Sequence, residues 1–84
     1  METFRGKLVQ GGLLVCGDAT VQLQDDLGDW WGTLSLRGDV RVRPGDHYTL
    51  SLEDGRAGLV LLRTATFMEA SDTRALFQGR GPLH

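Results

Sequence analysis

The sequence predicts an all-β fold, a small single-domain barrel or a tightly curled sandwich, of about six mostly antiparallel strands joined by glycine-rich hairpins. Apolar and polar residues alternate in several windows, and no window has the i, i+3, i+4, i+7 apolar spacing of an amphipathic helix. Several of the twelve glycines stand between these windows, where tight turns need them. The 84 residues suffice for one core, so we expect one domain at 1–80 and a fraying tail at 81–84. The expected strands are 4–10, 13–23, 30–37, 48–52, 57–67 and 73–79.

The first hairpin is predicted around Gly11 and Gly12, because two residues that tolerate positive φ suit a two-residue loop. A loop of that length places Gln10 opposite Leu13 and decides which side chains face the core. The expected inward residues are Phe4, Gly6, Leu8, Leu13, Val15, Ala19, Val21 and Leu23. Because this alternation outlasts an ordinary strand, we expect a bend or bulge near Gly17.

The middle of the chain contains the two tryptophans. The polar, acidic stretch 25–29 predicts a loop, and the alternation that follows predicts a strand at 30–37. In that strand Trp30 faces the core and Trp31 faces outward. A short apolar alternation at 40–43 follows, ended by a Pro-Gly pair of the kind that suits a type II turn. A two-residue hairpin at Gly38 and Asp39 would conflict with burying Val40 and Val42, so we expect a looser connection there.

The second hairpin is predicted at the Asp-Gly pair 54–55, which is typical of a two-residue type I′ turn. It joins the strands at 48–52 and 57–67. With a two-residue loop, Val60 and Leu62 lie on the outer face of the later strand. That strand is therefore expected to be apolar on both of its faces.

Composition and charge exclude several classes of protein. Nine basic and eleven acidic residues give a net charge of −2, which argues against a strongly basic nucleic-acid clamp or a polybasic membrane surface. The single cysteine cannot form a disulfide within the chain, which suits a reducing compartment. No apolar run has the length of a signal peptide or a membrane span, so we expect a cytoplasmic protein without membrane contact.

The residues that could support catalysis or metal binding are few. A pair formed by Cys16 and His47 could give a thiolate nucleophile, but Cys16 is expected on an outer face and nothing in the sequence brings the two together. The acidic stretch 25–29 lacks the ligand pattern of a calcium loop, and one cysteine with two histidines is too few for a zinc site. We therefore expect no enzyme activity, no metal and no cofactor.

A second set of aliphatic side chains is expected on the outside of the sheet. Monomers rarely leave many contiguous aliphatic side chains in water, so either the chain covers this set itself, as in a two-layered sandwich, or a partner covers it. We favour a non-catalytic module for self-association, as a homo-oligomer, or for binding another protein. The predicted interaction surface, with the outward tryptophan as its aromatic hot spot, is Val9, Leu14, Trp31, Val60 and Leu62.

The alternative hypothesis is an OB-like barrel that binds single-stranded nucleic acid or an oligosaccharide. Small barrels of that kind stack bases on aromatic side chains and follow the backbone with cations. The residues that could supply both groups are Trp31, Arg37, Arg41 and Arg43. Acidic residues are interspersed with these cations and would cancel much of their attraction for phosphate, so this hypothesis is not favoured.

Overall fold

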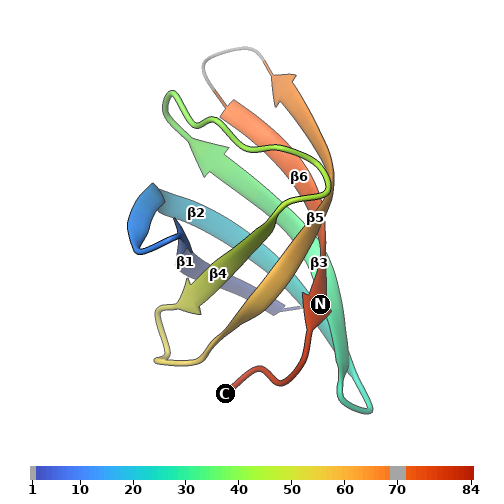
Figure 1. The fold of residues 1–84 in the computed structure, drawn as a ribbon. Coiled ribbons are helices and arrows are strands. Elements are labelled where there is room, and N and C mark those ends of the chain that lie inside the picture. Colours follow the sequence, from blue (N-terminus) through green and yellow to red (C-terminus); the bar gives the residue numbers. More distant parts are fainter. Residues whose placement is uncertain (1, 69–71) are drawn as a thin grey trace.

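The computed structural model describes residues 2–68 and 72–84, and over these residues the protein is a closed barrel of antiparallel strands (Figure 1). The six strands are β1 Glu2–Gln10, β2 Leu13–Asp26, β3 Asp29–Arg37, β4 His47–Leu52, β5 Ala57–Met68 and β6 Asp72–Arg80. The predicted all-β fold is confirmed, and the sheet closes as a barrel. Within the described ranges no helix is long and apolar enough to cross a membrane.

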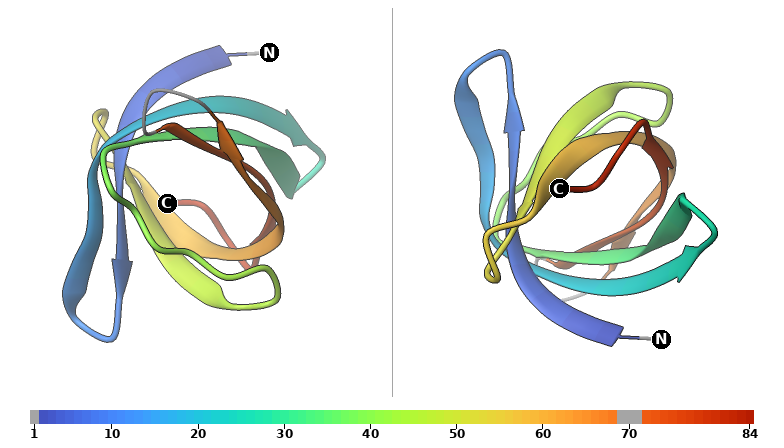
Figure 2. Two further views of the ribbon diagram at one scale, coloured as in Figure 1. Left: turned by 90° about the horizontal axis from the view of Figure 1, so that it is seen from above. Right: turned by 90° about the horizontal axis from the view of Figure 1, so that it is seen from below.

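The barrel consists of two three-stranded meanders, β1-β2-β3 and β4-β5-β6. Antiparallel pairing of β3 with β6 and of β1 with β4 joins the meanders and closes the ring, which Figure 2 shows from above and below. The segment 38–46 connects β3 to β4. These closing pairs join strands that lie far apart in the sequence. They therefore place outer-face residues side by side that the order of the hairpins alone does not predict to be neighbours.

The looser connection predicted after β3 is confirmed, because the segment 38–46 has no strand partner. Val40 and Val42 are instead half-buried and pack against the core. In a closed barrel the paired strands already have two neighbours, so an apolar alternation in a connection is buried by packing and not by pairing. The Pro-Gly turn that ends the segment is confirmed, since Gly45 has a φ of 90° and the Asp46 N–H donates to the Arg43 carbonyl at 3.2 Å.

The first hairpin has the predicted turn. Gly11 and Gly12 have φ values of 58° and 78°, and Gln10 pairs with Leu13. Further along, two register shifts place Leu8 opposite Cys16 instead of Val15 and leave Gly17 within a bulge, as expected near that glycine.

These shifts change which side chains of β2 face the core. The outward placement predicted for Cys16 is wrong, because its side chain is buried. The inward placement predicted for Leu13 is also wrong, because Leu13 is exposed near the tip of a hairpin that extends beyond the ring of strands (Figure 2). Val15 is half-buried against the core.

The hairpin between β4 and β5 has a three-residue loop in place of the predicted two-residue type I′ turn. The Gly55 N–H donates to the Leu52 carbonyl at 3.0 Å, and the Leu52 N–H donates to the Arg56 carbonyl at 2.8 Å. Gly55 has a φ of 96°, whereas Asp54 is not among the described residues with positive φ. A type I′ turn needs positive φ at both positions, so the geometry is that of a type I turn followed by a glycine bulge.

The extra loop residue moves the register of β5 by one. Tyr48 faces Val60, and Thr49 faces Leu59. Because the side-chain period of a strand is two, a shift of one residue exchanges its two faces. The outward placement predicted for Val60 and Leu62 is therefore wrong: both have 0% exposure and belong to the core.

The connection between β2 and β3 is tighter than the loop predicted at 25–29. Asp26 pairs with Asp29, which leaves only Leu27 and Gly28 in the turn, with φ values of 52° and 89°. Leu27 is 99% exposed and is the only non-glycine residue with positive φ in the described part of the chain. Positive φ is unfavourable for a branched side chain, so Leu27 lowers the stability of the folded state, and its exposed side chain makes no packing contacts that offset this cost.

Trp30 faces the core as predicted and closes one end of the barrel. Its indole lies against Gly58 and Gly79, where an added Cβ would overlap the ring. The indole N–H donates to the Gly81 carbonyl at 2.9 Å, so both the apolar body and the polar edge of the side chain are satisfied. The two glycines are needed here because the ring occupies the space of a side chain.

The tail 81–84 lies along the start of β5, a contact that the sequence pattern did not indicate. The Ala57 N–H donates to the His84 carbonyl at 2.9 Å, and the His84 N–H donates back to the Ala57 carbonyl at 3.0 Å. Leu83 packs against the core beside these bonds. The tail thus completes the end of the barrel that Trp30 occupies.

Candidate functional site

The outward side chains of β5, β4, β1 and β2 include a row of aliphatic residues. Thr49 pairs with Leu59 on one side and with Val9 on the other, and Val9 in turn pairs with Leu14. Leu14 is 61% exposed and Leu59 is 44% exposed, while Val9 is half-buried. Leu61, also half-buried, follows Leu59 on the same face of β5. We call Val9, Leu14, Leu59 and Leu61 the outer aliphatic surface.

The outer aliphatic surface shares some residues with the predicted interaction surface and differs from it in others. Val9 and Leu14 lie on it as expected, and the neighbours Leu59 and Leu61 take the places predicted for the two buried residues of β5. Trp31 faces outward on β3 and is partly exposed, as predicted. Gln78 separates it from Leu61, because it pairs with both. Trp31 therefore lies beside the outer aliphatic surface, at its border.

The tip of the β1–β2 hairpin extends this apolar region away from the barrel. Leu13 and Leu14 are consecutive and both exposed, so each face of the two-stranded ribbon presents a leucine. In Figure 2 the ribbon extends beyond the ring of strands from both viewpoints. A side chain at this tip can reach a partner that approaches the outer aliphatic surface.

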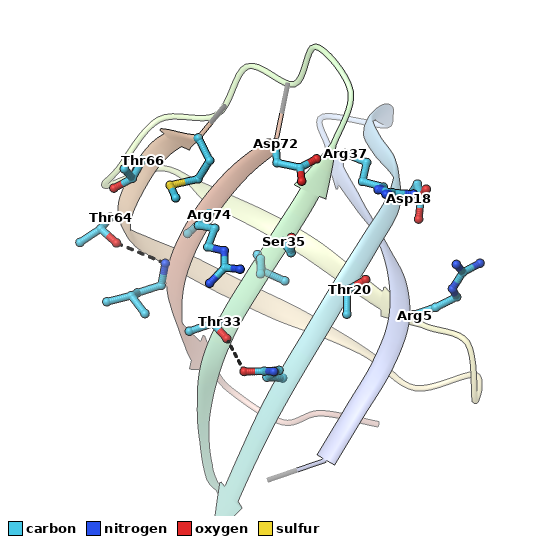
Figure 3. A pocket seen from close by; sticks show the side chains of 15 residues that line it. Arg5, Asp18, Thr20, Thr33, Ser35, Arg37, Thr64, Thr66, Asp72 and Arg74 are labelled. Carbon is cyan, nitrogen blue, oxygen red and sulfur yellow. Dashed lines mark hydrogen bonds between the residues drawn. The ribbon is translucent and has the colours of Figure 1, made fainter. Parts of the chain in front are cut away.

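A second surface, on the outside of β1, β2, β3, β6 and β5, is rich in charged and hydroxyl side chains, although the exposed Met68 and Leu76 also line it. It is a shallow groove of about 820 Å³, shown in Figure 3, and we call it the polar groove. Its charged lining residues are Arg5, Asp18, Arg37, Asp72 and Arg74. Hydroxyl groups lie between them, on Thr20, Thr33, Ser35, Thr64 and Thr66.

Two of the hydroxyls already have partners within the groove. The Thr33 hydroxyl lies 3.2 Å from the Gln22 side-chain oxygen and donates to it. The Leu76 N–H donates to the Thr64 hydroxyl at 3.3 Å, next to the register shift that interrupts the β5–β6 ladder. For the hydroxyls of Thr20, Ser35 and Thr66, the part of the chain that the structure describes supplies no hydrogen-bond partner.

The residues of the alternative hypothesis do not gather at one place. Trp31 and Arg37 lie toward opposite ends of β3, about 20 Å apart along the strand. Arg37 lines the polar groove, whereas Trp31 does not. Arg41 and Arg43 lie in the connection 38–46, where the Arg43 N–H donates to the Tyr48 hydroxyl at 3.0 Å. Stacking on Trp31 and phosphate contacts by these arginines would thus involve separate parts of the surface.

The candidate catalytic pair is also separated. Cys16 is buried inside the barrel, where its thiol lies 3.3 Å from the Asp18 carbonyl and 3.8 Å from the Arg37 carbonyl. His47 is exposed at the start of β4. Among residues 2–68 and 72–84, no group of three or more histidine, cysteine or acidic side chains is arranged to hold a metal ion.

The polar groove was not predicted, because it depends on the pairing of β3 with β6. That pairing places Ser35 beside Arg74, and the pairing of β6 with β5 places Arg74 beside Thr66. The hydroxyl residues alternate with apolar ones along their strands, a pattern that indicates an outer face but gives no indication of which strands adjoin.

Comparison with protein-family models, with curated proteins and with solved structures finds no match to this chain.

Proposed function

We propose that this domain is a non-catalytic module that associates with a second copy of itself through the outer aliphatic surface. The observation that carries the proposal is the arrangement of that surface: by register, Leu59, Val9 and Leu14 follow one another across the strands, with the exposed Thr49 between Leu59 and Val9. Single exposed leucines are ordinary, but a contiguous apolar patch is typical of an interface. Burying it gains about 25 cal/mol for each Å² of apolar area.

The chemistry of the surface favours a second copy as the partner. An apolar patch is complementary to itself, so a two-fold axis can pack Leu59 of one copy against Val9 of the other. The residues that adjoin it by register are Thr49, His47, Gln78 and Arg80; the positive charge of Arg80 lies opposite Leu59, at the margin of the apolar patch.

The proposal is tested by the mass in solution of the native chain and of matched variants. We expect a mass of about twice the 9.2 kDa of one chain at high concentration. Leu59→Arg is expected to reduce the mass to that of the monomer, because it places a charge in the apolar interface. Thr66→Arg is the control, since it introduces the same charge at an exposed site further along β5.

Two results would overturn the proposal. One is a native chain that stays monomeric at high concentration, in which case another protein is the remaining candidate for the outer aliphatic surface. The other is dissociation by Thr66→Arg as complete as that by Leu59→Arg. Circular dichroism of each variant shows whether it retains the strand content of the native chain.

A further inference from the structure

We infer that the polar groove is a binding site for a phosphate group, centred on Arg74. The groove and the outer aliphatic surface occupy different parts of the barrel. The groove is centred on β2, β3 and β6, whereas the aliphatic side chains lie over β5, β4, β1 and the tip of the first hairpin. The site is therefore independent of the self-association proposed above.

The register places Arg74 between two hydroxyls. Ser35 lies directly opposite it on β3, and Thr66 lies directly opposite it on β5. The Cβ atoms of such opposed pairs are about 4.5–5.5 Å apart. Figure 3 shows all three side chains on the groove face of the sheet. A planar guanidinium flanked by two O–H donors can surround one oxyanion with hydrogen bonds.

The acidic residues of the groove are placed nearer to another arginine. Asp72 pairs across the sheet with Arg37, and Figure 3 shows Asp18 beside Arg37 as well. In the ranges that the structure describes, the only ion pair joins Arg56 to Asp54, on the β4–β5 hairpin. Among the described residues the guanidinium of Arg74 therefore makes no ion pair, although Asp72 lies two residues before it on the same strand.

The composition of the groove favours phosphate over a sugar ring or a base. The described residues that line it include no aromatic side chain, and stacking of a base or sugar needs an aromatic platform. Guanidinium and hydroxyl groups are instead the donors that proteins use for phosphate oxygens. Among the lining residues that the structure describes, three arginines outnumber two aspartates, within a chain whose net charge is −2.

The test uses inorganic pyrophosphate as the probe, at low ionic strength, and follows the backbone amide signals of the native chain by NMR. We expect saturable shifts at Ser35, Thr66 and Arg74. Arg74→Gln is expected to weaken binding about tenfold or more, because it removes a charge-assisted hydrogen bond. Arg80→Gln removes the same charge from the same strand outside the groove, and is expected to change the affinity by less than about twofold.

Three outcomes would overturn the assignment. The first is the absence of saturable binding by the native chain. The second is an equal loss of affinity in the Arg74 and Arg80 variants, which would mean that pyrophosphate responds only to net charge. The third is binding of a single-stranded oligonucleotide that depends on Trp31 and not on Arg74. The Leu59→Arg variant is expected to bind pyrophosphate as the native chain does, which separates a failure of this site from a failure of self-association.

Discussion

The register of β5 decides which of its leucines stabilise the barrel, and two alanine substitutions test it. Leu62 has 0% exposure, so Leu62→Ala leaves a cavity in a closed core. Substitutions of this kind cost about 3–5 kcal/mol. Leu59 lies on the other face and is 44% exposed. Because its surroundings open to water, Leu59→Ala leaves no cavity and is expected to cost about 1 kcal/mol or less.

The size of the chain makes this difference easy to measure. Domains gain about 0.05–0.15 kcal/mol of stability per residue, which for 84 residues is about 4–13 kcal/mol in total. Leu62→Ala would therefore remove a large fraction of the free energy of unfolding. The assay is urea unfolding followed by tryptophan fluorescence, in a dilute solution where association does not contribute, with Trp30 as the buried reporter.

The opposite ranking would refute the register. A two-residue loop at Asp54 and Gly55 would turn Leu59 inward and Leu62 outward. Under that pairing Leu59→Ala would be the costly substitution and Leu62→Ala the mild one. Equal costs would contradict the structure as well, because the two side chains differ so widely in exposure.

Three further outcomes are expected from local geometry. Gly79→Ala should lower the free energy of unfolding by about 1–3 kcal/mol, because the new Cβ overlaps the Trp30 indole. Gly17→Ala is the control and should change the free energy of unfolding by less than about 0.5 kcal/mol. Similar urea midpoints for the two variants would contradict this prediction. Leu27→Asn should raise the free energy of unfolding by about 1 kcal/mol, since asparagine tolerates positive φ better than leucine, and an unchanged midpoint would show that the turn is not strained. The Arg56 backbone N–H, and then its guanidinium, hold the pKa of Asp54 below its usual range. The folded state therefore gains stability from the ionised carboxylate above the unfolded pKa and loses it as the pH falls through the folded pKa. Asp54→Asn should be less stable than the native chain near pH 7 and equal to it at about pH 2; a difference that persists in acid would point to another cause.

The hairpins show how far turn chemistry predicts this fold. The pair Gly11 and Gly12 was predicted correctly because both glycines occupy positions with positive φ. The pair Asp54 and Gly55 is compatible with two loops that differ by one residue, and the sequence pattern favoured the shorter one. That single residue exchanged the faces of β5. The prediction of an outer aliphatic surface therefore named the correct strands, but it included Val60 and Leu62, which face the core.

Features that depend on pairing between distant segments were beyond prediction from one sequence. Cys16 is buried because it lies between two register shifts: the first, after Leu14, changes the parity of β2, and the second, before Ala19, restores it. The polar groove is a comparable case. Arg74 and Ser35 lie far apart in the sequence, and only the pairing of β3 with β6 makes them neighbours. The tail 81–84 was expected to fray, whereas it is hydrogen-bonded to Ala57 at the start of β5. This partner also lies far away in the sequence, so the pattern of the tail itself did not indicate it.

Self-association is tested most directly by the mass of the native chain as a function of concentration, measured by light scattering. We expect the mass to rise from the 9.2 kDa of one chain toward about twice that value. The same series for Leu59→Arg should stay at the mass of one chain. A native chain that remains a monomer throughout, or a Leu59→Arg variant that associates equally well, would contradict a function based on the outer aliphatic surface.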